Sequence, residues 1–257
     1  MSQSDPTDLL YGLHPILEAL RAKDRGLHRI YLEPGRRGRA VEEILQLAKT
    51  QHVPVTFEAR ADLDRRAGSS RHQGAVGVAA AKAYLSLDEL LNTVAALDSP
   101  LLLVLDGLED PHNLGAILRT AEAVGAQGVI LPNRRAVGLT ATVAKASAGA
   151  IEHLPVARVV NVAQTIKQLK EARFWVYGLD AKGNRSYLEV DYRGPLALVV
   201  GGEGRGIRPL VAEQCDGRIN IPMQGKVASL NASVATAIVL YEVLRQRAGT
   251  LTRAAPG

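Results

Sequence analysis

Three stretches of the chain combine small residues with polar side chains that could bind a ligand or assist catalysis. They read DGLEDPHNLGAILRT over residues 106–120, VVGGEGRGIRP over 199–209 and IPMQGKVASLNAS over 221–233. Each joins an apolar run of strand length to a helical pattern. Ligands of open parallel sheets bind outside the carboxyl ends of the strands. These stretches therefore predict one site at one edge of a sheet.

The elements that would position these residues follow an α/β pattern. In the second half of the chain, helical patterns separate apolar runs of strand length, namely PLLLVLDGL, GVILP, FWVYGLD, LALVVGGE and RINIPM. This alternation predicts a parallel sheet covered on both faces. Residues 11–82 contain shorter elements, with strands expected in HRIYLEP, VPVTFEA and GAVGVAAA and helices before and between them. They predict a smaller α/β domain.

The glycines of the second stretch do not match a known phosphate-binding loop. The Rossmann spacing from Gly202 requires a glycine at position 207, where the chain has Ile207. The Walker spacing over residues 201–206 must be followed by Lys and then Ser or Thr, but Ile207 and Arg208 follow. A nucleotide triphosphatase or a dinucleotide enzyme is therefore disfavoured. The glycines indicate a close backbone approach or positive φ angles instead.

Each polar residue of these stretches also has a purely structural interpretation when taken alone. Asn113 could cap the helix that follows it, and Glu203 could favour the dipole of the next helix. Ser229 or Asn231 could cap the last long helix, and Arg119 could form a surface ion pair. Only their concentration at three strand exits favours a functional site.

The composition bounds the class of protein. The chain has 257 residues, of which 47% are hydrophobic and 22% charged, with a net charge of +5 and a pI of about 9.4. The basic balance permits a nucleic-acid partner. No stretch reaches the length of a membrane span, the start MSQSDPTDLL is unlike a signal peptide, and the single Cys215 cannot form an internal disulfide. We expect a cytoplasmic protein without membrane or metal partners.

The three stretches also carry a family resemblance. N-L-G-A-I-L-R-T-A-E-A-V-G, V-V-G-G-E-G-R-G-I and I-P-M-x-G-x-V-x-S-L-N-A-S-V-A resemble the three ordered motifs of the SpoU (TrmH) branch of the SPOUT methyltransferases. The resemblance covers most of residues 98–247. It implies a C-terminal α/β-knot domain, in which a deep trefoil knot binds S-adenosylmethionine, and a homodimer whose two protomers complete the active site. General rules of chain connection disfavour a knot, so the resemblance alone implies it.

The resemblance also implies which residues bind the cofactor. The third motif would line the pocket through its backbone, Gly201 and Gly202 would close the opposite side, and Leu179 would help to hold the adenine. The predicted cofactor-binding residues are Leu179, Gly201, Gly202, Ile221, Met223, Ser229 and Leu230. No metal is implied.

Catalytic roles follow from the same resemblance for Asn113, Arg119, Glu203, Ser229 and Asn231. The reaction would move a methyl group from a sulfonium to a ribose 2′-hydroxyl, which requires in-line orientation and a proton acceptor. Arg119 would be essential. An arginine stays charged, so it serves more easily as a phosphate anchor than as a base, and its role stays open. Asn113 would position Arg119 or the ribose, and Glu203 would orient that network.

The front of the chain resembles the L30e-like RNA-binding extension of the 23S ribosomal RNA members of this branch. YGLHPILEAL and RHQGAVGVAA mark its beginning and end. We therefore expect an L30e-like domain over residues 1–82, a linker over 83–97 and the SPOUT domain over 98–257. Contacts to RNA are predicted for the arginines Arg36, Arg37, Arg39, Arg65, Arg66, Arg71 and Arg119.

The resemblance favours one function and leaves two alternatives. Members of the RlmB type methylate a guanosine ribose in the P loop of domain V of 23S rRNA, and the front domain favours this substrate. Another rRNA site or a tRNA would keep the chemistry and change the RNA. A non-catalytic RNA-binding assembly factor would keep only the fold.

Overall fold

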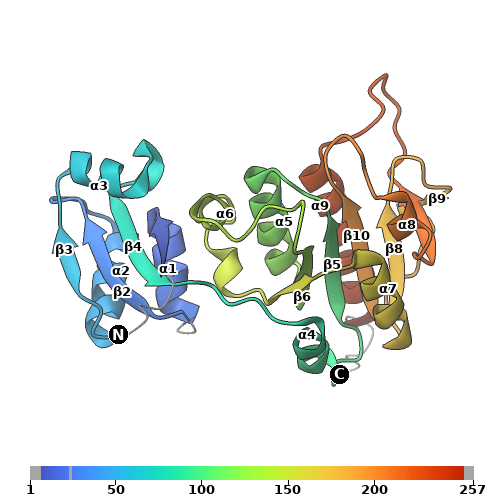
Figure 1. The fold of residues 1–257 in the computed structure, drawn as a ribbon, viewed down its shortest axis with the longest axis horizontal. Helices are drawn as coiled ribbons and strands as arrows, with labels where there is room; N and C mark the ends of the chain where they lie inside the picture. Colours follow the sequence, from blue (N-terminus) through green and yellow to red (C-terminus); the bar gives the residue numbers. More distant parts are fainter. Residues whose placement is uncertain (1–6, 23–24, 252–257) are drawn as a thin grey trace. The chain divides into compact units, whose positions relative to one another are not determined.

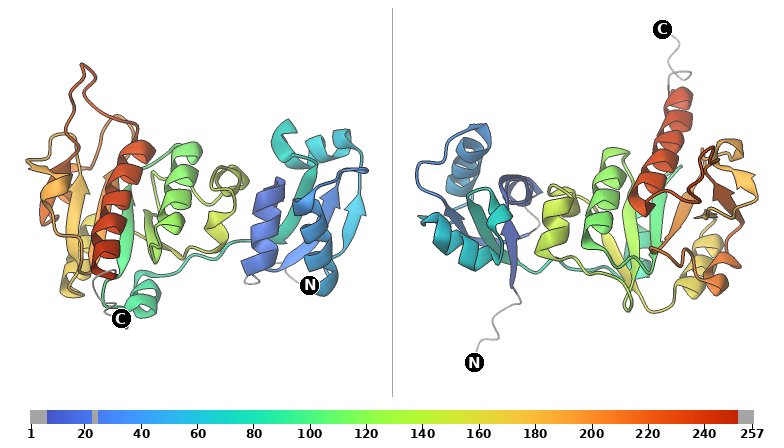
Figure 2. Two further views of the ribbon diagram at one scale, coloured as in Figure 1. Left: turned by 180° about the vertical axis from the view of Figure 1, so that it is seen from behind. Right: turned by 90° about the horizontal axis from the view of Figure 1, so that it is seen from above.

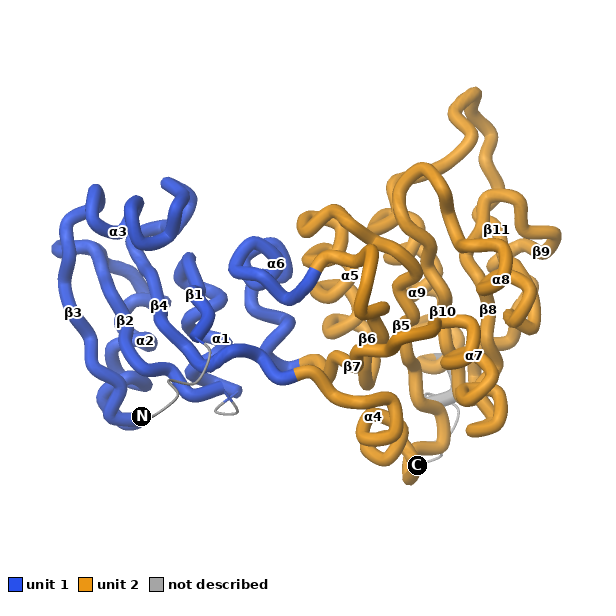
Figure 3. The backbone as a smooth tube through the Cα atoms, viewed as in Figure 1, with its two compact units in different colours: residues 1–83, 138–153 blue, residues 84–137, 154–257 orange. Residues whose placement is uncertain are grey.

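The chain divides into two compact units. A computed structural model describes residues 7–22 and 25–251. Unit 1 comprises residues 1–83 and 138–153, and unit 2 comprises residues 84–137 and 154–257 (Figure 3). Residues 138–153, which the sequence placed in the SPOUT domain, thus group with the front of the chain. The boundaries at 82 and 98 stay predictions, and the outermost residues of both expected domains, 1–6 and 252–257, lie outside the described residues.

Unit 1 is built on a four-stranded mixed sheet with the order β1-β4-β2-β3. β4 pairs antiparallel with β1 and β2, whereas β2 and β3 are parallel. The strands are β1 (Thr7–Tyr11), β2 (Leu27–Leu32), β3 (Val55–Phe57) and β4 (Ala75–Ala80), and the helices are α1 (Leu13–Ala22), α2 (Arg39–Thr50), α3 (Arg60–Ala67) and the 3-10 turn η1 (Ser70–His72). The predicted strands and helices of residues 11–82 are confirmed. The strand β1 was missed because its first residues are polar and partly exposed, and the short turn η1 was not predicted.

A buried ion pair fastens residues 138–153 within unit 1. This segment forms α6 (Ala141–Ala146) and the 3-10 turn η2 (Ala150–Glu152). Arg25 donates to Glu152 at 2.8 Å and to Asp8 at 2.5 Å. The side chains of Arg25 and Glu152 are only 4% and 0% exposed. Arg25, which lies between α1 and β2, therefore compensates the buried charge of Glu152 in η2 and also pairs with the partly exposed Asp8 of β1.

Unit 2 is a seven-stranded sheet with the order β7-β6-β5-β10-β8-β11-β9, and every pairing in it is parallel. The strands are β5 (Leu101–Asp106), β6 (Gly128–Pro132), β7 (Val156–Val159), β8 (Trp175–Leu179), β9 (Arg185–Ser186), β10 (Leu196–Gly201) and β11 (Gly217–Asn220). All five predicted strands are confirmed. The edge strands β7 and β9 were missed because they are short and carry arginines that interrupt an apolar run.

Helices cover both faces of this sheet, as the continuous apolar strands predicted (Figures 1 and 2). The apolar side chains of α4, α7 and α8 form one core with β5, β8 and β10, and α5 and α9 lie side by side on the other face. The helices are α4 (Leu87–Val94), α5 (Pro111–Ala123), α7 (Val162–Glu171), α8 (Pro209–Ala212) and α9 (Ala232–Leu251), with 3-10 turn η3 (Tyr187–Glu189) after β9. Within residues 7–22 and 25–251, no helix combines the length and apolarity needed to cross a membrane.

The register of the parallel strands brings the predicted site residues to one edge. Asp106 at the end of β5 lies opposite Gly201 at the end of β10, and Leu179 at the end of β8 lies opposite Val200. Because all strands run in the same direction, the chain leaves the sheet on the same side at each of these positions. The knot itself stays a prediction.

The Arg25–Glu152 pair allows a test of the packing of unit 1. We expect Arg25→Ala to lower the free energy of unfolding of unit 1 by about 3–5 kcal/mol, because a buried carboxylate loses its partner. Urea unfolding followed by circular dichroism measures this. Arg21→Ala is the control, since Arg21 pairs with Glu43 on the surface with 44% of its side chain exposed and should change stability little. Equal stability of the Arg25 and Arg21 variants would contradict the role assigned to the buried pair.

Candidate active site

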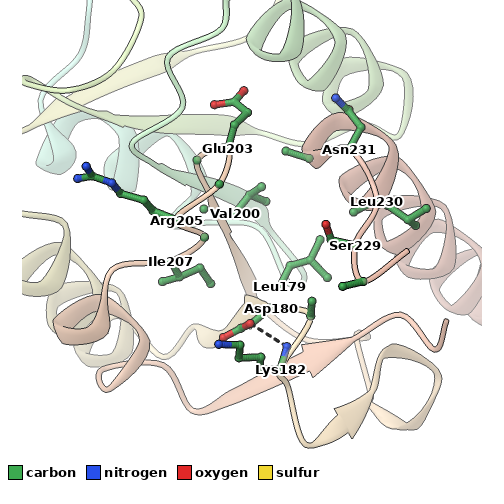
Figure 4. Close-up of a pocket in the computed structure, with 18 of the residues that line it drawn as sticks. Leu179, Asp180, Lys182, Val200, Glu203, Arg205, Ile207, Ser229, Leu230 and Asn231 are labelled. Carbon is green, nitrogen blue, oxygen red and sulfur yellow. Dashed lines mark hydrogen bonds between the residues drawn. The ribbon is translucent and has the colours of Figure 1, made fainter. Parts of the chain in front are cut away.

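A cavity of about 510 Å³ lies at the strand exits of unit 2. The segments after β8 and β10 and the loop before α9 form its walls. All seven predicted cofactor-binding residues line it, namely Leu179, Gly201, Gly202, Ile221, Met223, Ser229 and Leu230. In Figure 4, Glu203 and Asn231 lie at one end of the cavity and Leu179 and Asp180 at the other. The structure thus brings the predicted residues together, while their roles in binding stay predictions.

Close backbone contact explains the glycines at positions 201 and 202. A Cβ atom on Gly201 would lie 2.1 Å from the carbonyl carbon of Gly206, and one on Gly202 would lie 2.0 Å from the carbonyl oxygen of Gly107. No side chain fits at such distances. The backbone of the second motif therefore packs directly against the loop after β5.

A salt bridge between Asp106 and Arg208 holds the far end of the glycine loop, residues 202–208. The Asp106 carboxylate, with 0% of its side chain exposed, accepts hydrogen bonds from the Arg208 backbone N–H at 2.9 Å and from the Arg208 Nε at 2.8 Å. The Gly202 N–H donates to the Asp106 carbonyl oxygen at 3.0 Å. Asp106 thus fixes both ends of the loop over residues 202–208. The sequence interpretation missed this pair, whose only signal was an aspartate ending an apolar run.

Side-chain hydrogen bonds connect the three motifs. The Asn113 amide donates to Glu203 at 2.6 Å, and the Asn231 amide donates to the Asn113 carbonyl oxygen at 3.0 Å. Asn113 is only 7% exposed. The interpretation of Asn113 as a helix cap is wrong, because Asp110 caps α5 by accepting from the His112 N–H. One buried amide instead sets the relative position of all three motifs.

Asn231 caps α9, as one structural interpretation of the sequence predicted, and it also bonds to Asn113. Its side-chain oxygen accepts from the backbone N–H groups of Ser233 at 2.9 Å and Val234 at 3.3 Å, and so caps α9. Its amide group meanwhile bonds to Asn113. Ser229 is exposed and lines the cavity two residues earlier. The start of α9 and the wall of the cavity are therefore fixed by the same side chain.

Arg119 lies apart from this network. It is exposed on α5 and is not among the residues that line the cavity. In the described part of the chain its side chain forms neither a hydrogen bond nor an ion pair, so the expected contact with Asn113 and the alternative surface pair are both absent. The Asn113 amide is instead shared between Glu203 and Asn231. A single chain does not bring Arg119 to the other predicted catalytic residues.

The predicted RNA-binding arginines of unit 1 differ in how far they are engaged. Arg36, Arg37, Arg39 and Arg71 are exposed. Arg65 pairs with Asp62. Arg66 forms two hydrogen bonds with Glu58, lowers the pKa of that carboxyl group, and stacks at 3.8 Å over Tyr31. Arg66 is therefore held within the fold, whereas Arg36, Arg37 and Arg39 present their side chains to solvent.

The single cysteine is unsuited to nucleophilic chemistry. Burial raises the pKa of the Cys215 thiol to about 12, and its sulfur is directed at the Val211 carbonyl oxygen at 3.4 Å. Among the described residues, no group of three or more His, Cys, Asp or Glu side chains could hold a metal ion. The polar side chains that line the cavity are the carboxylates of Asp180 and Glu203, the cations of Lys182 and Arg205, the hydroxyl of Ser229 and the amide of Asn231.

Comparison with known proteins identifies the family. Residues 100–241 match the SpoU rRNA Methylase family, and residues 9–85 match an RNA 2′-O ribose methyltransferase substrate-binding family. The chain belongs to the SpoU rRNA methylase family. The predicted family and the predicted fold class, a parallel α/β domain with a smaller N-terminal α/β domain, are thereby confirmed.

Relatives in this family align over almost the whole chain. YacO of Bacillus subtilis (strain 168), named as a TrmH family tRNA/rRNA methyltransferase, is 46% identical over 95% of this chain and 98% of its own length. The 23S rRNA (guanosine-2′-O-)-methyltransferase RlmB of Ralstonia nicotianae is 44% identical over 93% of this chain and 96% of its own.

A solved structure of the family shows a related fold with its cofactor. The SpoU methyltransferase AviRb from Streptomyces viridochromogenes, in complex with AdoMet, has a TM-score of 0.79 at 26% sequence identity. The alignment covers 93% of this chain and 90% of AviRb. AdoMet is S-adenosylmethionine, the cofactor predicted from the motifs.

The close approach at Gly202 generates a prediction for cofactor affinity. We expect Gly202→Ala to weaken binding of S-adenosylmethionine by about tenfold or more, equivalent to about 1.4 kcal/mol, because the added methyl group displaces the loop from Gly107. Isothermal titration calorimetry measures this. Gly194→Ala is the matched control, since a Cβ atom there would meet nothing within 4 Å. Unchanged affinity in the Gly202 variant would exclude this loop as a wall of the cofactor site.

Proposed function

We propose that this chain transfers a methyl group from S-adenosylmethionine to the 2′-hydroxyl of a guanosine ribose in the domain V P loop of 23S rRNA. The observation that carries the proposal is the cavity whose polar end presents Glu203 and Asn231, both bonded to Asn113. Membership of the SpoU family supports the chemistry. The 44% identical RlmB of Ralstonia nicotianae supports a guanosine of 23S rRNA as substrate.

The cavity suits the cofactor in size and in lining. Ligand sites typically span about 300–1,000 Å³, and this cavity has about 510 Å³. Val200, Ile207 and Leu230 give it apolar walls for an adenine ring. The exposed backbone of the glycine loop adds polar groups that can approach a ligand closely. We therefore place the adenine towards Leu179 and the reacting methyl group towards Glu203 and Asn231.

The residues at the polar end would orient the acceptor ribose. S-adenosylmethionine, when bound, supplies an electrophilic methyl group. As the C–O bond forms and the C–S bond breaks, the proton of the 2′-hydroxyl must pass to an acceptor, here a phosphate oxygen or water. Asn113 holds the Glu203 carboxylate in one orientation, so that it can accept a hydrogen bond from the ribose without reorganising. Arg119, which stays charged, would hold the target phosphate.

A homodimer would bring Arg119 to the cavity of a partner. Arg119 lies on α5 away from the cavity of its own chain, and α5 packs along α9. The neighbouring helix α9 exposes an apolar stripe that includes Val234 (49% exposed) and Tyr241 (55% exposed). Exposed apolar side chains at helical spacing are typical of a face that packs against another protein surface. We infer that this face joins two protomers.

The substrate RNA would contact unit 1 through its exposed arginines. Arg36, Arg37 and Arg39 lie together after β2 and are exposed, which suits contacts to the phosphate backbone. A tRNA remains the alternative substrate, because YacO is named for both tRNA and rRNA. The network of Asn113, Glu203 and Asn231 argues against an assembly factor that only binds RNA, because such a protein does not need polar groups that orient a ribose. The cytoplasmic location stays a prediction.

The decisive experiment is a methyl-transfer assay with labelled S-adenosylmethionine on unmodified 23S rRNA and on tRNA, followed by mapping of the modified nucleotide. We expect label at one guanosine of domain V. Label on tRNA would replace the substrate and retain the chemistry. Cofactor binding without transfer to either RNA or to ribosomal assembly intermediates would overturn the proposal.

Arg119 provides a test of the catalytic assignment. We expect Arg119→Ala to reduce the turnover rate by about 100-fold or more, because the target phosphate would lose the guanidinium assigned to hold it, while affinity for S-adenosylmethionine stays unchanged. Single-turnover kinetics and calorimetry separate the two effects. Arg119→Lys should recover part of the rate, since it restores the charge but not the planar geometry. Normal turnover by the alanine variant would remove Arg119 from the mechanism.

The apolar stripe of α9 provides a test of the dimer. We expect Tyr241→Asp to sediment as a monomer and to lose methyl transfer, because a charge would be placed in an apolar interface. Analytical ultracentrifugation measures the mass. Leu210→Asp on α8 is the control, since Leu210 is 70% exposed and lies on the opposite face of the sheet. A wild-type chain that is active as a monomer would refute the dimer.

A further inference from the structure

A basic loop that has no role in the proposed mechanism lies at the same edge of the sheet as the cavity. Residues 133–137 follow β6, which pairs with β5. The Asn133 N–H donates to the Val159 carbonyl oxygen at 2.8 Å, and the Val137 N–H donates to the Leu108 carbonyl oxygen at 3.0 Å. The loop is therefore anchored at both ends to the exits of the strands on either side of it.

This anchoring places the loop beside the second motif. Leu108 follows Gly107, whose carbonyl oxygen is in contact with Gly202. The Arg135 carbonyl oxygen lies 3.7 Å from the position of a Cβ atom on Gly107. Three loops thus lie next to one another in the order of the strands β6, β5 and β10, and the last of them bears Glu203. A nucleotide whose ribose reached Glu203 would bring a flanking phosphate of its backbone to these loops.

Arg135 has an unusual backbone conformation within this loop. Its φ angle is 57°, in the left-handed region that residues with a Cβ atom rarely adopt. Glycine would adopt this conformation more easily. Strained residues of this kind cluster at ligand-binding sites, where the surrounding structure maintains them.

The guanidinium groups of the loop are unpaired. Arg134 and Arg135 are both exposed, and within the described residues neither forms an ion pair or a side-chain hydrogen bond. Glu109 and Asp110 lie on the adjacent loop, but Asp110 caps α5 instead. By contrast, Arg208 at the same edge is paired with Asp106. Two adjacent positive charges are therefore available to a ligand at the edge of the sheet.

We propose that Arg135, assisted by Arg134, binds a backbone phosphate of the substrate RNA next to the methylated nucleotide. The inference rests on the proposed function, since it assumes that RNA enters the cavity from this edge. A guanidinium matches two phosphate oxygens with parallel N–H donors. Such a contact positions the RNA without reading its sequence. The contact with Arg135 would orient the ribose from the side opposite to the third motif, residues 221–233.

The substitution Arg135→Gly separates the effect of the guanidinium from that of the backbone conformation. Glycine keeps the φ angle of 57° accessible and removes the guanidinium, so the loop should retain its conformation. Arg173→Gly is a matched control in the same unit. Arg173 is also exposed and has a φ angle of 66°, but it precedes β8 and so lies at the opposite edge of the sheet.

The experiment measures RNA affinity against salt concentration for the full chain with transcripts of 23S rRNA domain V and of a tRNA. Between about 50 and 200 mM KCl, we expect Arg135→Gly to weaken binding of the bound transcript about threefold to tenfold and to reduce the slope of log affinity against log salt by about 0.7–0.9. Arg173→Gly should match the wild-type chain. Affinity for S-adenosylmethionine should be the same in all three proteins.

The possible outcomes distinguish this inference from the proposed function. Equal RNA affinity and salt slope for the Arg135 and Arg173 variants would overturn the inference, as would an affinity loss without a change in slope. If either of these results were found while the wild-type chain transfers methyl groups normally, the inference would fail and the proposed function would stand. If Arg135→Gly alone loses RNA affinity and the wild-type chain transfers no methyl group, the phosphate contact would be supported and the proposed reaction refuted.

Discussion

In a parallel sheet, neighbouring strands leave the sheet on the same side, and here β5 and β10 do so with their backbones in contact. Asp106 lies opposite Gly201, and Gly202 approaches the Gly107 carbonyl so closely that no Cβ atom fits. The Asp106–Arg208 pair closes the loop at its other end. The remaining features of the site depend on this approach, because it brings Glu203 within reach of Asn113.

The hydrogen bonds around Asn113 convert this backbone arrangement into one polar network. A buried amide that donates to Glu203 and accepts from Asn231 connects segments 118 and 90 residues apart in the sequence. Leaving one partner unpaired would cost the desolvation of a buried polar group. The network therefore stabilises one arrangement of the three motifs and with it the shape of the cavity. The same atoms serve the fold and the proposed chemistry.

The arginines of the chain divide into those that the fold uses and those that it leaves to a partner. Arg25, Arg66 and Arg208 form ion pairs that hold segments together. Arg119 on α5 and Arg135 in the loop after β6 are exposed, and their side chains are unpaired within the described residues. A basic net charge alone could not make this distinction, because it counts charges without their partners. The distribution supports a polyanionic partner at the edge of the sheet that carries the cavity.

The sequence by itself determined the family, the parallel sheet and seven of the residues that line the cavity, because apolar strands and motif spacing are local patterns. It did not determine that Asn113 joins three motifs and leaves the capping of α5 to Asp110, nor that Asp106 pairs with Arg208, since these contacts depend on strand register. Nor did it reveal that residues 138–153 group with the front of the chain, where Arg25 neutralises Glu152 across 127 residues of chain. Long-range pairing of buried charges has no local signal, so only the tertiary structure decided it.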